Sequence, residues 1–170
     1  LEDEINLSIA TKVYEMLIDL GARTLISRVD DYDLSDVYAK NHKIQDLKKR
    51  IAYMKENQAD LFVSIHLNSF SNSDVSGAQV FYKKNVPSSE EFALVMQQTF
   101  NSINKKEKKP KVGDYYLLNN SGDLNGVMVE CGFLSNTEER NQLITDAYQE
   151  KIASLIKDGI LAYLEAKNRI

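Results

Sequence analysis

Two ionisable residues stand at the ends of short apolar runs in this chain of 170 residues. His66 ends the run that begins at Leu61, and Glu130 lies near the end of the run Val127–Cys131. Burying such a side chain costs free energy unless a metal ion, a charged partner or a shifted pKa compensates. An imidazole and a carboxylate are also groups that bind metals and transfer protons. The two residues are therefore candidates for a catalytic or metal-binding site.

These two residues also have plainer interpretations. A single histidine at a strand end is more often a hydrogen-bonded structural residue than a metal ligand. For Glu130, a structural ion pair with Arg28 or Arg50 competes with a catalytic role, because ion pairs also perturb the chemistry of buried carboxylates. Residue types alone leave both interpretations open.

Three other features have simpler explanations than catalysis. His42 lies in a polar stretch and is expected to be exposed to solvent. Cys131 has no matching histidine motif nearby, so a small buried hydrophobic residue is the better interpretation. The basic run Lys105–Lys111 is broken by Pro110, which is typical of a solvated loop, and contact with an acidic ligand is the alternative.

The elements that would position His66 and Glu130 alternate between helices and strands. Apolar residues at helical spacing predict helices at residues 5–20, 44–54, 88–103 and 148–164, with Gly21 ending the first and Asn136 capping a short one. Short apolar or β-branched runs predict strands at residues 24–26, 61–66, 77–82, 115–118 and 127–131.

This alternation predicts a single α/β domain. We expect a mostly parallel, twisted central sheet of about five to six strands, flanked by helices on both faces. In such sheets, ligands bind in the crevice beyond the carboxyl ends of the strands. His66 and Glu130 are expected to meet at that edge.

Composition excludes several classes of function. The chain has 25 acidic and 21 basic residues and a net charge of -4, so it carries no electrostatic footprint for nucleic acid. No apolar run approaches the roughly 18 residues needed to span a bilayer, and no signal segment opens the chain, so an integral membrane domain is not expected. The single cysteine cannot form an internal disulfide and therefore does not indicate the redox compartment.

Three sequence blocks carry a resemblance to one enzyme family. They read Glu-Asp-Glu-Ile-Asn-Leu-x-Ile-Ala from Glu2, Ala-Asp-Leu-Phe-Val-Ser-Ile-His-Leu-Asn from Ala59, and Val-Glu-Cys-Gly-Phe-Leu-Ser-Asn from Val129. In order and approximate spacing they resemble the zinc-dependent N-acetylmuramoyl-L-alanine amidases, which have an amidase type 3 domain. Weaker matches extend the resemblance over nearly the whole chain, at Ser27–Asp31, Arg50 and Ser89–Ala93.

The resemblance implies an activity and three site residues. In the match, Glu2 and His66 are zinc ligands, Glu4 falls on a non-ligand position, and Glu130 is the catalytic carboxylate; substrate-binding residues remain unassigned. The implied reaction is hydrolysis of the amide between N-acetylmuramic acid and L-alanine in peptidoglycan, outside the cytoplasmic membrane. The alternatives are another zinc amidohydrolase or carboxypeptidase, and a catalytically silent peptidoglycan-binding relative.

One part of the family pattern has no counterpart here. The family has a first strand and a Gly-His-Gly-Gly turn ahead of the glutamate ligand, and that turn supplies a further zinc-binding histidine. We therefore expect residues 1–170 to be the catalytic domain without this strand and turn, with two of three protein ligands. An activating protein partner that stabilises the metal site would fit this arrangement. A catalytic domain without added wall-binding repeats resembles the germination-specific amidases of the spore cortex.

Overall fold

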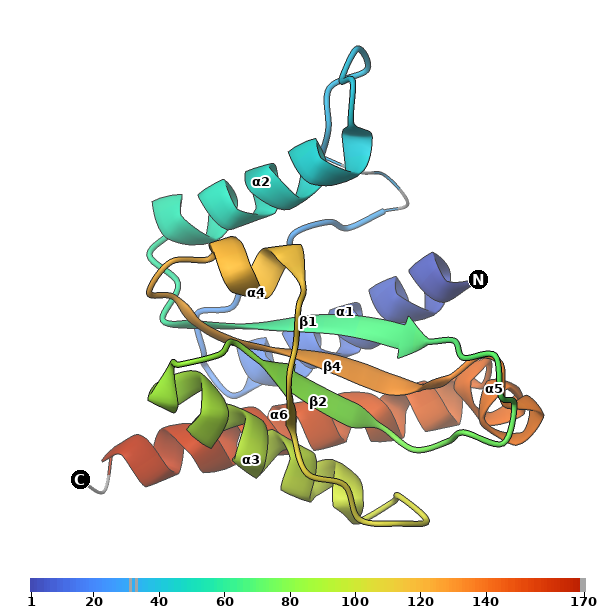
Figure 1. The fold of residues 1–170 in the computed structure, drawn as a ribbon. Coiled ribbons are helices and arrows are strands. Elements are labelled where there is room, and N and C mark those ends of the chain that lie inside the picture. Colours follow the sequence, from blue (N-terminus) through green and yellow to red (C-terminus); the bar gives the residue numbers. More distant parts are fainter. Residues whose placement is uncertain (31, 33, 169–170) are drawn as a thin grey trace.

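The computed structural model describes residues 1–30, 32 and 34–168, and in this part of the chain a sheet of four strands lies between two layers of helices (Figure 1). The strands are β1 (Leu61–Asn68), β2 (Gln79–Tyr82), β3 (Lys111–Val112) and β4 (Asn125–Phe133). The helices are α1 (Glu2–Asp19), α2 (His42–Glu56), α3 (Pro87–Asn101), α4 (Tyr116–Asn120), α5 (Thr137–Leu143) and α6 (Asp146–Asn168). The expected α/β architecture is confirmed.

The sheet is mixed, and the prediction of a mostly parallel sheet of five to six strands is wrong. The strand order is β1-β4-β2-β3, and β4 pairs parallel with β1 but antiparallel with β2. A parallel return to the same sheet needs a long crossover, usually a helix. The chain instead passes from β1 to β2 through residues 69–78, which form no helix, so β2 runs in the opposite direction.

Two expected strands are not strands. Residues 24–26 have no regular secondary structure, and Leu25 is partly exposed, so this short run has no buried face to pair over. Residues 115–118 enter helix α4, in which Leu117 and Leu118 are both buried. Neighbouring residues of a strand point to opposite faces, whereas one helical turn can bury two consecutive leucines in the same cluster.

Helix α1 shows how local signals set an element's limits. Its buried stripe consists of apolar residues spaced by four, Ile5, Ile9, Val13 and Leu17. It ends at Gly21 as predicted: the Ala22 N–H donates to the Leu17 carbonyl at 3.0 Å and the Gly21 N–H to the Ile18 carbonyl at 2.8 Å. Gly21 has φ 81°, a conformation that costs glycine little, so it stops the helix.

Other local predictions have mixed outcomes. Helix α5 is capped as expected, since the Glu139 N–H donates to Asn136 Oδ1 at 3.0 Å. The helix predicted from residue 88 is α3, which begins one residue earlier, at Pro87, whose fixed φ suits a first helical position. The basic run is a loop up to Lys111, which pairs in β3. No helix within the described residues is long and apolar enough to cross a membrane.

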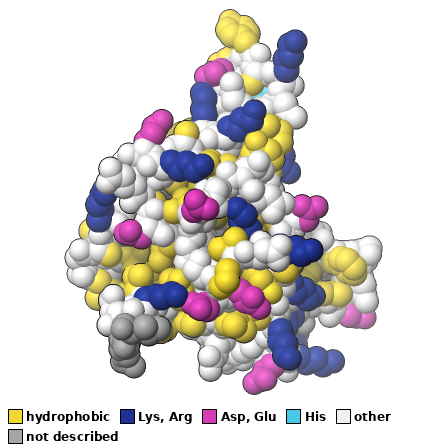
Figure 2. Space-filling view, turned by 60° about the vertical axis from the view of Figure 1, so that its left-hand side comes forward, with side chains coloured by type: hydrophobic (Ala, Val, Ile, Leu, Met, Phe, Trp, Pro, Cys, Tyr) yellow, Lys and Arg dark blue, Asp and Glu magenta, His cyan; other side chains and the backbone are white. Residues whose placement is uncertain are grey.

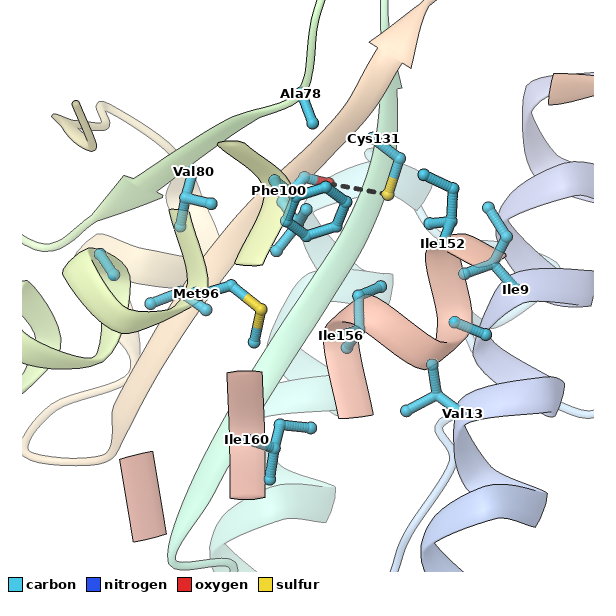
Figure 3. Packing of buried hydrophobic residues seen from close by; sticks show 14 of the residues in the cluster. Ile9, Val13, Ala78, Val80, Met96, Phe100, Cys131, Ile152, Ile156 and Ile160 are labelled. Carbon is cyan, nitrogen blue, oxygen red and sulfur yellow. Dashed lines mark hydrogen bonds between the residues drawn. The ribbon is translucent and has the colours of Figure 1, made fainter. Parts of the chain in front are cut away.

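The larger hydrophobic core lies between the sheet and the layer formed by α1, α3 and α6. Figure 3 shows Ile9 and Val13 of α1 facing Ile152 and Ile156 of α6, all of them buried. Cys131 lies in this core with 1% of its surface exposed, and burial raises the pKa of its thiol far above the ordinary value. The interpretation of this cysteine as a small buried hydrophobic residue is confirmed.

A second, smaller core lies on the opposite face, under α2 and α4 (Figure 1). It contains Ile51 of α2, Leu117 and Leu118 of α4, Phe62 of β1 and Met128 of β4. On the face shown in Figure 2, basic and acidic side chains are interspersed, which fits the small net charge. The second core matters for function because it adjoins the ionisable residues.

Candidate active site

Strand alternation directs Glu130 and His66 to the same face of the sheet. Along β4, Val129 and Cys131 pack in the larger core, so Met128 and Glu130 face the α2 and α4 side. Along β1, Phe62 belongs to the second cluster, and His66 lies four residues further on the same face. Because β1 and β4 are parallel neighbours, both side chains reach the same edge of the sheet.

The strand register then places these two residues side by side. His66 is the direct partner of Glu130 across the β1–β4 ladder, and neighbouring strands lie about 4.8 Å apart. The register becomes irregular immediately afterwards, between His66 and Asn68. The pair therefore stands at the last position before this shift in register, near the carboxyl ends of both strands.

Glu2 joins this pair from the first turn of α1. Its Oε1 lies 3.5 Å from His66 Nδ1, and it accepts hydrogen bonds of 3.3 Å from the Leu67 N–H and from Asn6 Nδ2. The contact with His66 is the main reason why the pKa of Glu2 is lowered, so this carboxylate is ionised at neutral pH. The side chains of Glu2 and His66 are each 41% exposed.

Glu130 is the buried member of the group. Only 7% of its surface is exposed, and this burial is the main cause that raises its pKa; the negative charge of Glu2 acts in the same direction. His66 and the Tyr115 hydroxyl oppose the shift without reversing it. Oε2 of Glu130 is buried and has no hydrogen-bond partner among the described residues. A carboxyl group in this condition is better suited than an exposed one to accept a proton and hold it for return.

Two nearby residues were not identified from the sequence. Asn6 lies one helical turn beyond Glu2 and donates to it, an i,i+4 relation that was readable in the first sequence block. Tyr115, assigned to a strand from its sequence, precedes α4, and its hydroxyl lies near enough to Glu130 to lower the pKa of that carboxyl. The sequence feature that could have identified Tyr115 is its place as a tyrosine at the polar end of an apolar run.

The two arginines that could have formed a structural ion pair with Glu130 have other partners. Arg50 pairs with Asp46, with Nε 2.7 Å from Oδ2, and Arg28 donates to the Asp3 carbonyl at 2.6 Å. Both guanidinium groups are thus engaged on the outer layers. His42 is exposed, as expected, and its Nδ1 lies 2.6 Å from Ser35 Oγ.

The donor atoms available at the site set what it can bind. Glu2 and His66 supply one oxygen and one nitrogen donor on the exposed side, and both are ligand types that zinc accepts. No cluster of three or more His, Cys, Asp or Glu side chains that could hold a metal occurs in residues 1–30, 32 and 34–168. The described residues therefore fit a metal centre as two of its ligands, with Glu130 beside them.

Comparison with known proteins shows the enzyme family that this chain resembles. A family model described as N-acetylmuramoyl-L-alanine amidase matches residues 1–162. The germination-specific N-acetylmuramoyl-L-alanine amidase of Bacillus subtilis (strain 168) is 34% identical over 172 residues, which cover 98% of this chain and 72% of the relative.

Solved structures show the same likeness. The CwlD amidase from Clostridioides difficile, solved in complex with the GerS lipoprotein, superposes with a TM-score of 0.89 at 36% identity, covering 97% of this chain and 87% of that one. The catalytic domain of the amidase CwlV from Bacillus (Paenibacillus) polymyxa gives a TM-score of 0.83 at 29% identity, and the match covers 97% of this chain and 86% of that one.

Proposed function

The chain belongs to the N-acetylmuramoyl-L-alanine amidase family, and from this membership we propose how its residues hydrolyse the amide between N-acetylmuramic acid and L-alanine in peptidoglycan. The observation that carries the proposal is the position of Glu130. It is buried, its pKa is raised, and it stands directly opposite His66, which contacts Glu2. A proton-transferring carboxyl thus adjoins two exposed metal donors.

Glu2 and His66 would hold a catalytic zinc ion, which when bound polarises the scissile carbonyl and lowers the pKa of water toward about 7. Glu130 takes one proton from the attacking water as the new C–O bond forms. It then returns that proton to the L-alanine nitrogen as the C–N bond breaks. Burial favours the protonated form of Glu130, which makes the carboxylate a stronger base for the first transfer.

Two alternatives predict different products. A zinc carboxypeptidase acting on the same polymer would release a free amino acid from the end of the stem peptide. A catalytically silent relative would bind peptidoglycan and release nothing. The buried, unpaired Oε2 of Glu130 favours catalysis, because keeping such a group costs stability and a silent protein gains nothing from it.

The same proposal includes a location and a partner. We place the reaction outside the cytoplasmic membrane, in the cell wall or the spore cortex, where peptidoglycan lies. We also propose an activating protein partner for this chain; the Clostridioides difficile relative was solved in complex with a lipoprotein. Glu2 and His66 come from separate elements and are each 41% exposed, so a partner that orders them would stabilise bound metal.

Digestion of purified peptidoglycan by the zinc-loaded protein tests the activity. We expect whole stem peptides with new L-alanine amino termini, and glycan strands without new reducing ends. A chelator should stop the release, and added zinc should restore it. Free D-alanine as the product would favour the carboxypeptidase, and binding without any release would favour the silent relative.

A further inference from the structure

Tyr115 lies between the second core and the candidate active site. Its ring packs in the cluster that contains Phe81 and Met128. Met128 and Glu130 are two residues apart on one strand, so their side chains share a face. The hydroxyl end of Tyr115 lies close enough to Glu130 for each side chain to shift the pKa of the other.

The Tyr115 ring is held tightly in this place. It meets the Phe81 ring edge-on, with centroids 5.2 Å apart and an interplanar angle of 68°. A Cβ atom at Gly113 would lie 2.7 and 2.9 Å from two carbons of the Tyr115 ring, which is too close, so only glycine allows this approach. The Gly113 N–H donates to the Tyr82 carbonyl at 2.9 Å and ties the segment to the sheet.

Glu130 otherwise has few fixed contacts. Its Oε2 is buried without a hydrogen-bond partner among the described residues, and β-strand geometry fixes only its backbone. A carboxylate that must meet an attacking water needs a defined rotamer, because catalysis falls steeply when a reacting group is misplaced. A clamped hydroxyl donor supplies that restraint while leaving one carboxylate oxygen free.

We propose that Tyr115 is a positioning residue for Glu130, whose hydroxyl donates to the carboxylate and holds it toward the scissile amide. This inference rests on the proposed function. Tyr115 acts through Glu130 and takes no part in bond making. The clamp formed by Phe81 and Gly113 keeps the donor in place between turnovers.

Tyr115→Phe tests the inference, because it removes the hydroxyl and keeps the ring in its clamp. We expect kcat to fall about tenfold, in the range for loss of one hydrogen bond to a charged group, with KM and Tm unchanged. Tyr116→Phe is the matched control, since it changes the adjacent tyrosine, and it should keep full activity. A kcat of Tyr115→Phe equal to that of the wild type would overturn the inference.

A double-mutant cycle separates positioning from direct action on the substrate. When Glu130→Gln is already present, adding Tyr115→Phe should cause less than about a twofold further loss, because the two residues act as one unit. An undiminished tenfold loss in that background would mean that the hydroxyl acts on the substrate, which contradicts the inference.

A spectroscopic measurement tests the contact between Tyr115 and Glu130 and does not depend on enzymatic activity. In protein labelled with ¹³C at tyrosine Cζ, the Tyr115 resonance should shift on Glu130→Gln and stay in place on Glu138→Gln, which changes an exposed glutamate. An unmoved Tyr115 resonance would overturn the inference even in an active enzyme. If the wild-type protein cleaves no peptidoglycan, the proposed function fails separately, and the resonance still reports whether the contact exists.

Discussion

Replacing Glu130 with Gln removes the proton acceptor while leaving the size of the side chain almost unchanged. Loss of a positioned general base lowers kcat by about 10²–10⁴-fold, which corresponds to roughly 3–5 kcal/mol of barrier. Since we do not assign Glu130 as a metal ligand, the zinc content of the variant should equal that of the wild type. The variant therefore separates proton transfer from metal binding.

The same substitution has a predictable effect on stability. Burial raises the pKa of Glu130 above its ordinary value of 4.5, so the ionised side chain destabilises the folded state. This penalty is fully present above the raised pKa, decreases as the pH falls through it, and vanishes below 4.5, where the carboxyl is protonated in both states. Glutamine carries no charge, so the variant should be more stable than the wild type at pH 7. A gain of about 1 kcal/mol would raise Tm by roughly 2–4 °C in a chain of this size.

Three measurements on the purified variant check these expectations. They are the rate at which L-alanine amino termini appear, the bound zinc by elemental analysis, and Tm at pH 4 and pH 7. Glu138→Gln is the control, because this exposed glutamate pairs with Lys105 away from the site. Turnover within about tenfold of the wild type would refute the role of Glu130 as the base. A Tm advantage at pH 4 as large as that at pH 7 would refute the electrostatic account.

Further predictions concern the metal and the packing. His66→Ala should lower both zinc occupancy and activity. His42→Ala, at an exposed position, should change neither. If His66→Ala still binds one zinc ion per chain, His66 has a structural role and is not a ligand. Zinc binding can be measured by calorimetry, and the 170-residue chain should bind zinc weakly, since Glu2 and His66 are only two ligands. A protein extended before residue 1 by a histidine-bearing turn should bind zinc tightly. Equal, tight, one-to-one binding by both proteins would contradict this prediction. Gly126→Ala should destabilise the fold by about 1–3 kcal/mol, because a Cβ atom there would lie 2.1–2.4 Å from ring carbons of Phe62, and an unchanged melting curve would refute this packing.

The sequence alone determined most of the local elements and the positions of His66 and Glu130 near the ends of two strands. The stripe at Ile5, Ile9 and Val13 and the stop at Gly21 report burial and backbone freedom within one helix, which are local properties. The apolar runs around His66 and Glu130 likewise predicted two strands with polar side chains at their ends. Residue pattern suffices in such cases because the 3.6-residue and two-residue periods identify the buried face of each element.

Only the tertiary structure decided how these elements meet. The direction of β2, the ladder that sets His66 opposite Glu130, and the approach of Glu2 to His66 depend on contacts between distant parts of the chain. The proposed role of Tyr115 depends on the run 115–118 leading into a helix instead of forming a strand. Periodicity identifies which face of an element is buried, but the partner that buries it is chosen by the free energy of the whole packed molecule.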